Sequence, residues 1–174
     1  MTLNTQLPNA EALLLTLEQK LSPFIQPKTA IVGIHSGGAW IAERIFPTLQ
    51  ASHPDCSLEL GMLDSSFYRD DYNQRGLHAD TRPSQIPFDV EERHIILIDD
   101  VFYTGRTIRA AMNELFDYGR PASITLAVLV DRGGRELPIC PQVAALQLDI
   151  PFDQKLQLSR DEHHQLQFSL EASA

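Results

Sequence analysis

Four short runs of mainly Ile, Val and Leu alternate with more polar stretches along the chain. Near-continuous apolar runs of this length are typical of strands buried on both faces of a parallel sheet. The four predicted strands cover residues 30–34, 58–63, 94–98 and 124–130. The run at 58–63 is the least apolar of the four, and the run at 94–98 is the clearest.

Apolar residues at helical spacing lie before and between these runs. They predict helices over residues 10–21, 39–49 and 108–116. Pro23 ends the first helix, and Gly119 and Pro121 stand where a helix-terminating glycine and proline belong after the third. Strand, helix and strand in this order predict an α/β fold with an open, mostly parallel sheet and flanking helices.

The long polar segment at residues 69–85 has no apolar periodicity. Loops longer than about 12–15 residues are uncommon in compact domains and are usually lids or disordered segments. The flanking segments are each too short to fold alone. We therefore expect one domain over residues 1–174 that carries a mobile loop at about 69–85.

Composition narrows the protein class. With 14 basic and 23 acidic residues the formal net charge is −9, which disfavours a protein that coats nucleic acid over its whole surface but allows a local basic patch. The two cysteines, Cys56 and Cys140, form no CxxC motif, which excludes a zinc ribbon and argues against a disulfide scaffold. No apolar run reaches the roughly 18 residues of a membrane span, so we expect a cytoplasmic protein without membrane contacts.

The candidate chemistry follows the run at 94–98, because ligands bind at the carboxyl ends of strands in open α/β sheets. This segment reads Asp99, Asp100, Val101, Phe102, Tyr103, Thr104, Gly105, Arg106 and Thr107. Residues 104–107 can direct backbone N–H groups and hydroxyls at a phosphate on the helix N-terminus. The paired carboxylates can hold a vicinal diol or stand beside a divalent metal. The alternative is that the segment merely caps a helix.

Residues 95–107 resemble the phosphoribosyl-pyrophosphate (PRPP) motif of type I phosphoribosyltransferases. Together with three further segments they resemble the PyrR family, which comprises pyrimidine operon regulators with uracil phosphoribosyltransferase activity. These segments are residues 66–71, 117–121 and 129–139. The resemblance covers about residues 30–140 and implies a type I phosphoribosyltransferase fold, with a flexible loop over the site and a small hood.

The resemblance also implies a reaction. The ribose 5-phosphate of PRPP would be transferred to N1 of uracil, giving UMP and diphosphate. Asp99 and Asp100 would hold the ribose hydroxyls and face the developing positive charge, while residues 101–107 would complete the PRPP site. Mg²⁺ would be held mainly through PRPP, with Asp99 or Asp100 as a further candidate ligand.

The turn after the first run corresponds to the pyrophosphate loop of the family. It consists of His35, Ser36, Gly37 and Gly38. Gly37 stands where many relatives carry arginine, so a backbone anion nest remains while one cation is missing. The alternative interpretation is a simple glycine-rich turn.

The loop at 69–85 corresponds to the flexible lid of the superfamily, with Arg69 and Asp70 as its candidate catalytic residues. Val130, Asp131 and Arg132 correspond to the hood over the base, where Arg132 could stack on or hydrogen-bond a pyrimidine. The alternatives are a solvated charge run in the loop and, in the hood, a tight Gly-Gly turn flanked by solvated arginines.

The resemblance implies regulatory partners as well. UMP or UTP in the site would favour binding to pyrimidine operon leader RNA, and the family forms homodimers or higher homo-oligomers. Residues 1–30 contain only Lys20 and Lys28 as basic residues, fewer than in RNA-binding relatives. Arg120, Arg132 and Arg135 remain as cations for an RNA contact, with Arg132 and Arg135 as the RNA candidates. A nucleotide sensor with little catalytic activity and an enzyme without RNA binding remain alternatives.

Overall fold

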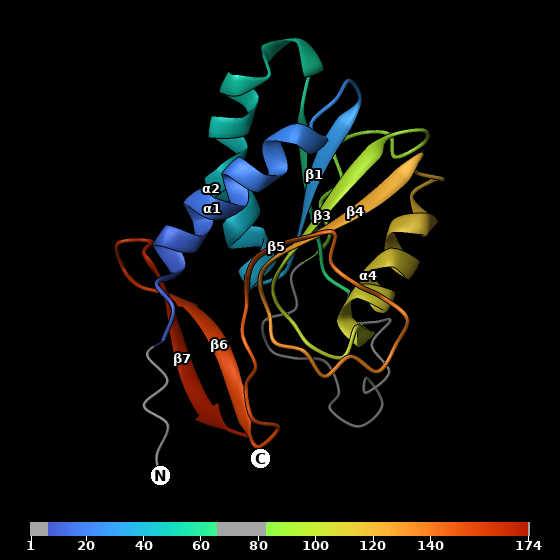
Figure 1. Ribbon diagram of the computed structural model, residues 1–174. Coiled ribbons are helices and arrows are strands. Elements are labelled where there is room, and N and C mark those ends of the chain that lie inside the picture. Colours follow the sequence, from blue (N-terminus) through green and yellow to red (C-terminus); the bar gives the residue numbers. More distant parts are fainter. Residues whose placement is uncertain (1–6, 66–82, 174) are drawn as a thin grey trace.

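The computed structural model describes residues 7–65 and 83–173 (Figure 1). A five-stranded sheet occupies its centre, with the strand order β2-β1-β3-β4-β5 and every neighbouring pair parallel. Its strands are β1 (Thr29–Ile34), β2 (Glu59–Leu63), β3 (His94–Phe102), β4 (Ser123–Asp131) and β5 (Val143–Gln147). The predicted open α/β fold is therefore confirmed.

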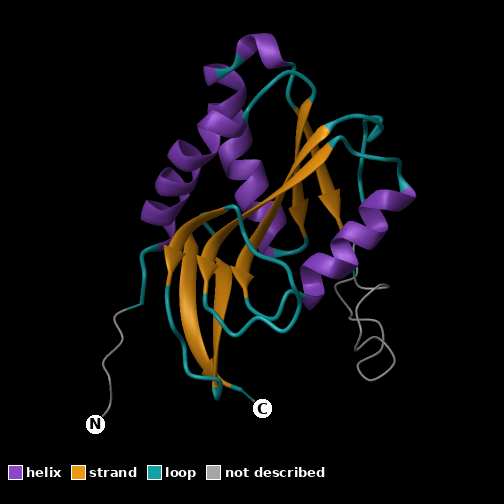
Figure 2. Cartoon of the chain, turned by 45° about the vertical axis from the view of Figure 1, so that its right-hand side comes forward, coloured by secondary structure: helices purple, strands orange, loops and turns teal. Residues whose placement is uncertain are grey.

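The described residues form three α-helices, α1 (Ala10–Leu21), α2 (Gly37–Ser52) and α4 (Arg106–Asp117). Figures 1 and 2 show α1 and α2 on one face of the sheet and α4 on the other. Side chains of β3 alternate between the two faces. Ile96 and Ile98 are buried with α1 and α2, whereas Ile95 and Leu97 are buried with α4. Strands covered on both faces explain the near-continuous apolar runs in the sequence.

The C-terminal part of the chain folds as an antiparallel hairpin of β6 (Gln154–Arg160) and β7 (Leu166–Ala172). Its apolar side is buried through Leu156, Leu158, Leu166 and Phe168. In Figure 1 the hairpin extends below α1 and β5. The sequence predicted neither this hairpin nor β5.

An ion pair joins the hairpin to the helices. The two carboxylate oxygens of Glu11 accept from Arg44 at 2.7 and 3.2 Å, and one of them also accepts from the Leu166 backbone N–H at 2.8 Å. The Arg44 guanidinium additionally donates to the His164 carbonyl at 3.0 Å. Residues of α1, α2 and the hairpin turn thus meet at one hydrogen-bonded junction.

Strand β3 is longer than predicted. The sequence placed its end at Ile98, but pairing with β4 continues through Val101↔Val130 to Phe102↔Asp131. Asp99 and Asp100 therefore lie inside the last part of β3 rather than after it. The apolar run stops at Ile98 although the backbone ladder continues, which is why the pattern alone ended the strand early.

The boundary of the predicted loop also changes. Gln85 exchanges two backbone hydrogen bonds of 2.8 Å with Met62, so it pairs with the edge of β2 and does not belong to a mobile loop. Arg69 and Asp70 lie outside the described residues, so their roles stay predictions. The single domain over residues 1–174 also stays a prediction. In the described part of the chain, no helix is both long and apolar enough to cross a membrane.

Candidate active site

Two helices begin at the carboxyl edge of the sheet, next to each other. Helix α2 follows β1 and helix α4 follows β3, and these two strands are neighbours. The lower ends of both helices lie at this edge in Figure 1. Neither N-cap residue, Ser36 or Gly105, caps its helix with a side-chain hydrogen bond. Backbone donors and the positive ends of two helix dipoles therefore converge where an anion can bind.

Asp99 and Asp100 lie between these two helix starts. Asp99 is 8% exposed, and its Oδ1 accepts from the Asp100 backbone N–H at 2.9 Å. Oδ1 of Asp100 accepts from the Val101 N–H at 2.8 Å. Both carboxylates are thus fixed by the backbone at the end of β3, the edge where ligands bind in open α/β sheets.

The predicted pyrophosphate loop touches this carboxylate pair. A Cβ at Gly37 would lie 2.4 Å from Oδ2 of Asp100, and a Cβ at Gly38 would lie 2.3 Å from the Ile98 carbonyl oxygen. Only glycine permits so close an approach of the backbone. A Cβ at position 37 would contact the Asp100 side chain, so the arginine that many relatives carry there would require Asp100 to move.

The segment between β3 and α4 has the conformation expected of a phosphate loop. Gly105 adopts a φ of 93°, a left-handed value that favours glycine. The Arg106 N–H donates to Oγ1 of Thr104 at 3.3 Å. The Thr104 carbonyl accepts from the N–H groups of Glu136 and Leu137, at 2.9 and 3.2 Å. Thr107 lies in the first turn of α4.

Arg106 pairs with a residue that sequence analysis had not selected. Its Nε lies 2.9 Å from Oε2 of Glu136, and both side chains are about half exposed. The two residues are 30 positions apart, and the sequence contains no local signal that joins them. The backbone bonds to Thr104 place Glu136 beside the start of α4, where its charge faces any bound phosphate.

The hood residues lie at the carboxyl end of β4. Val130 is fully buried, and Asp131 is 6% exposed, with its Oδ2 paired to Arg135 at 3.1 Å. Arg132 is 5% exposed, and its Nη2 donates to the Pro151 carbonyl at 3.1 Å. Its guanidinium carbon lies 4.1 Å from the centroid of the Tyr103 ring.

This placement bears on the expectations for Arg132. A side chain buried to this degree offers little surface for phosphate contacts, so the structure does not support RNA binding by Arg132, which stays a prediction. The Tyr103 ring covers one face of its guanidinium, and that face is closed to a stacked base. Arg135 remains an RNA candidate, because its side chain is 42% exposed.

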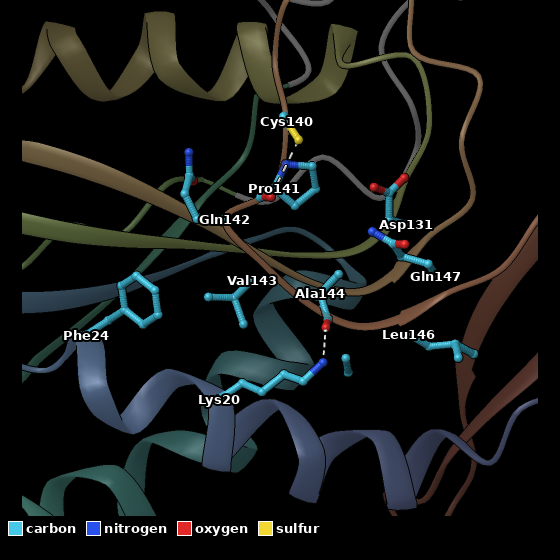
Figure 3. Close-up of a pocket in the computed structure, with 11 residues that line it drawn as sticks. Lys20, Phe24, Asp131, Cys140, Pro141, Gln142, Val143, Ala144, Leu146 and Gln147 are labelled. Carbon is cyan, nitrogen blue, oxygen red and sulfur yellow. Dashed lines mark hydrogen bonds between the residues drawn. The ribbon is translucent and has the colours of Figure 1, made fainter.

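A separate cavity of about 590 Å³ lies along β5 (Figure 3). Lys20 and Phe24 reach it from the end of α1 and the turn that follows, and Lys20 Nζ donates to the Ala144 carbonyl at 2.8 Å. Asp131 is the one predicted site residue among those that line it. No residue of the predicted PRPP motif lines this cavity, which is therefore separate from the candidate active site at the start of α4.

Glu114, in the last turn of α4, makes a half-buried contact with the segment that follows β2. The Ser84 hydroxyl donates to Oε1 of Glu114 and accepts from the Asp64 N–H at 2.8 Å. Burial raises the pKa of Glu114 above its usual value, and the negative charges of Asp64 and Asp117 act in the same direction, while the Ser84 bond opposes them. This position therefore favours a protonated carboxyl more than water does.

The chemistry of the site suits Mg²⁺ carried by a phosphate ligand. Among the described residues, no group of three or more His, Cys, Asp or Glu side chains is placed to hold a metal. Oδ2 of Asp100 faces the N-terminus of α2, where a diphosphate would lie. Mg²⁺ binds few protein carboxylates and prefers phosphate oxygens and water, so Asp100 fits the part of a single protein ligand.

The family model of the phosphoribosyl transferase domain matches residues 9–154. The bifunctional protein PyrR of Nitrosococcus oceani is 49% identical over 155 residues, which cover 89% of this chain and 85% of that protein. The chain belongs to the PyrR family. The PyrR protein of Pseudomonas aeruginosa is 53% identical over 127 residues, covering 73% of this chain and 72% of that protein.

Solved structures extend the fold assignment beyond the PyrR family. A hypoxanthine phosphoribosyltransferase of Staphylococcus aureus matches 85% of this chain and 80% of its own, with a TM-score of 0.61 and 18% identity. A hypoxanthine-guanine phosphoribosyltransferase of Bacillus anthracis covers 85% of both chains, with a TM-score of 0.62 and 15% identity. These likenesses show the type I phosphoribosyltransferase fold that the sequence predicted.

Proposed function

We propose that this protein transfers the phosphoribosyl group of PRPP to N1 of uracil, forming UMP and diphosphate, and that uridine nucleotides in the same site control its action on pyrimidine operon expression. The observation that carries the enzymatic part is the pair of helix starts at neighbouring strands, with Asp99 and Asp100 between them. Two anion sites separated by two carboxylates match a substrate with a phosphate at one end and a diphosphate at the other.

The residues divide the work of the reaction. The N-terminus of α4, with residues 104–107, holds the 5-phosphate, and the N-terminus of α2, with residues 35–38, holds the diphosphate. Asp99 and Asp100 bind the ribose hydroxyls and stabilise the positive charge that develops on the ribose as the bond to diphosphate breaks. When bound with PRPP, Mg²⁺ neutralises the leaving diphosphate, and Oδ2 of Asp100 is the protein oxygen placed to contact it.

We propose uracil as the base because of the sequence identity with PyrR proteins, and not because of the structural similarity to other phosphoribosyltransferases. The PyrR proteins are 45–53% identical to this chain, whereas the hypoxanthine phosphoribosyltransferases are at most 20% identical. Backbone groups of residues 130–132 are the candidate base contacts, because the Arg132 side chain is engaged elsewhere. Arg69 and Asp70, which lie outside the described residues, are proposed to close over the ribose.

The direct test is formation of UMP from uracil, PRPP and Mg²⁺ by the purified protein. We expect equimolar UMP and diphosphate, with no product when Mg²⁺ is removed by a chelator. Absence of UMP while the protein still binds UMP would favour the alternative function, a nucleotide sensor with little catalytic activity.

For the regulatory part we propose binding to pyrimidine operon leader RNA, in the cytoplasm and as a homodimer or higher homo-oligomer. Arg135 at the hood is the candidate contact. A filter-binding titration with the leader RNA of its own operon, with and without UMP, tests this. We expect UMP to tighten binding, and an affinity that UMP leaves unchanged would contradict nucleotide-responsive control.

A further inference from the structure

Arg132 is a buried cation without a carboxylate partner among the described residues. Its donors reach the Ile150 and Pro151 carbonyls at 3.4 and 3.1 Å, and its Nε has no hydrogen-bond partner there. Burying a charge is costly unless something compensates it. The negative face of the Tyr103 ring, 4.1 Å from the guanidinium carbon, is the compensation that the described structure offers.

The Tyr103 ring is also held from the hood. A Cβ at Gly134 would lie 2.5 Å from Cε2 of Tyr103, and Gly134 has a φ of 75°. The Arg132 N–H donates to the Phe102 carbonyl at 3.1 Å. Residues 132–137 therefore lie beside the segment between β3 and α4, and both backbone and side-chain contacts hold the two segments together.

We propose that Tyr103 is a positioning residue, whose ring holds the Arg132 guanidinium and so fixes the base side of the site relative to the phosphate loop. Because Arg132 also donates to the carbonyls of residues 150 and 151, which precede β6, fixing its guanidinium also fixes this segment. The role in the reaction rests on the proposed function. It is proposed in place of the expected contact between Tyr103 and PRPP, because the ring of Tyr103 faces Arg132.

The proposal requires the ring of Tyr103 and not its hydroxyl. Tyr103→Phe keeps the π face over Arg132, so we expect UMP formation within about twofold of the parent. Tyr103→Leu removes the π face. The free energy of a desolvated cation–π contact corresponds to a change of about tenfold or more in an equilibrium constant. We expect this loss as a raised KM for uracil, with a smaller change in kcat.

Hydrogen exchange gives a readout that is independent of activity. The Gln154 N–H donates to the Pro151 carbonyl at 3.0 Å, the same carbonyl that Arg132 holds. In Tyr103→Leu the Gln154 amide should exchange about tenfold faster, whereas in Tyr103→Phe its exchange should match the parent. A residue that only touches substrate would leave this exchange unchanged.

Tyr118→Leu is the matched control, because Tyr118 is 43% exposed against 38% for Tyr103 and lies at the far end of α4. It should change neither the KM for uracil nor the exchange of the Gln154 amide. Tyr103→Met, which also lacks a π face, replaces Tyr103→Leu if the latter does not fold.

Two results would overturn the proposal. One is a Tyr103→Leu variant, or its Tyr103→Met replacement, with parental exchange and KM. The other is a Tyr103→Phe variant as impaired as Tyr103→Leu, which would assign the role to the hydroxyl. Should the parent form no UMP while the exchange pattern follows the ring, the proposed function fails and the contact between Tyr103 and Arg132 stands.

Discussion

Asp99 and Asp100 are held by backbone N–H groups beside the start of α2. In the proposed reaction they face a cationic transition state, so replacing both with asparagine should lower the rate of UMP formation by at least about a hundredfold. The asparagines keep the size of the side chains, so the melting temperature should change little. A double variant with activity within about twofold of the parent would show that these carboxylates do not serve the reaction.

Thr107 lies in the first turn of α4, where its hydroxyl can donate to the 5-phosphate. Such a charge-assisted bond contributes roughly 1.5–3 kcal/mol, so Thr107→Val should weaken UMP binding by about tenfold or more. Calorimetry measures the affinity, with Thr16→Val on α1 as the control. Equal affinities for Thr107→Val and the parent would place the phosphate elsewhere.

Helix α4 carries a carboxyl group that opposes folding at neutral pH. Burial raises the pKa of Glu114 above its usual 4.5, so its contribution to stability is complete below pH 4.5 and is lost as pH rises through the higher pKa of the folded state. Glu114→Gln keeps an oxygen that accepts from Ser84. It should raise the melting temperature at pH 7 by about 1–2 °C, an estimate discounted for solvent screening.

Thermal melts at pH 7 and at pH 4 check this prediction. The gain from Glu114→Gln should largely disappear at pH 4, where Glu114 is mostly protonated in both the folded and unfolded states. Glu162→Gln, in the exposed turn of the hairpin, removes the same charge and should show no such pH dependence. A lower melting temperature for Glu114→Gln at pH 7 would mean that the ionised carboxylate stabilises the helix.

Helices and strands were predictable where the hydrophobic pattern of one continuous segment indicates them. The helix over 10–21 has the bounds of α1, and the four apolar runs all form strands of the sheet. Strands β6 and β7 were missed because the strand predictions relied on continuous apolar runs. Both strands instead alternate apolar and polar residues, with Leu156 and Leu158 in β6 and Leu166, Phe168 and Leu170 in β7, which is the local pattern of half-buried strands and could have indicated the hairpin.

The candidate site was predictable as a motif but not as a set of contacts. Residues 99–107 and 35–38 stand at the edge of the sheet that the sequence predicted. The pairs Arg106–Glu136 and Tyr103–Arg132 join segments about 30 residues apart, and the closeness of Gly37 to Asp100 spans more than 60. Such contacts depend on the register of neighbouring strands, which the hydrophobic pattern does not specify.

At the scale of the whole molecule the net charge of −9 limits how RNA can bind. Each neutralised phosphate contributes about −0.7 to −0.9 to the slope of log affinity against log salt concentration. With Arg135 as the remaining hood candidate, leader RNA should bind with a shallow slope, and Arg135→Ala should remove a large share of the affinity. Filter binding at several salt concentrations measures both.

The control for this prediction is Arg160→Ala, which removes an arginine of the hairpin that pairs with Glu43. Nanomolar affinity with a steep salt slope, unchanged in Arg135→Ala, would contradict the prediction. The basic surface would then have to arise from assembly of several chains.

The central claim is that this fold, shared with hypoxanthine phosphoribosyltransferases, transfers phosphoribose to uracil at Asp99 and Asp100. A competition assay tests it most directly, with equal amounts of uracil and hypoxanthine, limiting PRPP and Mg²⁺, and chromatography of the nucleotide products. We expect UMP as the dominant product from the parent and none from Asp99→Asn/Asp100→Asn. Equal or greater formation of IMP, or UMP formation that survives the double substitution, would contradict the account.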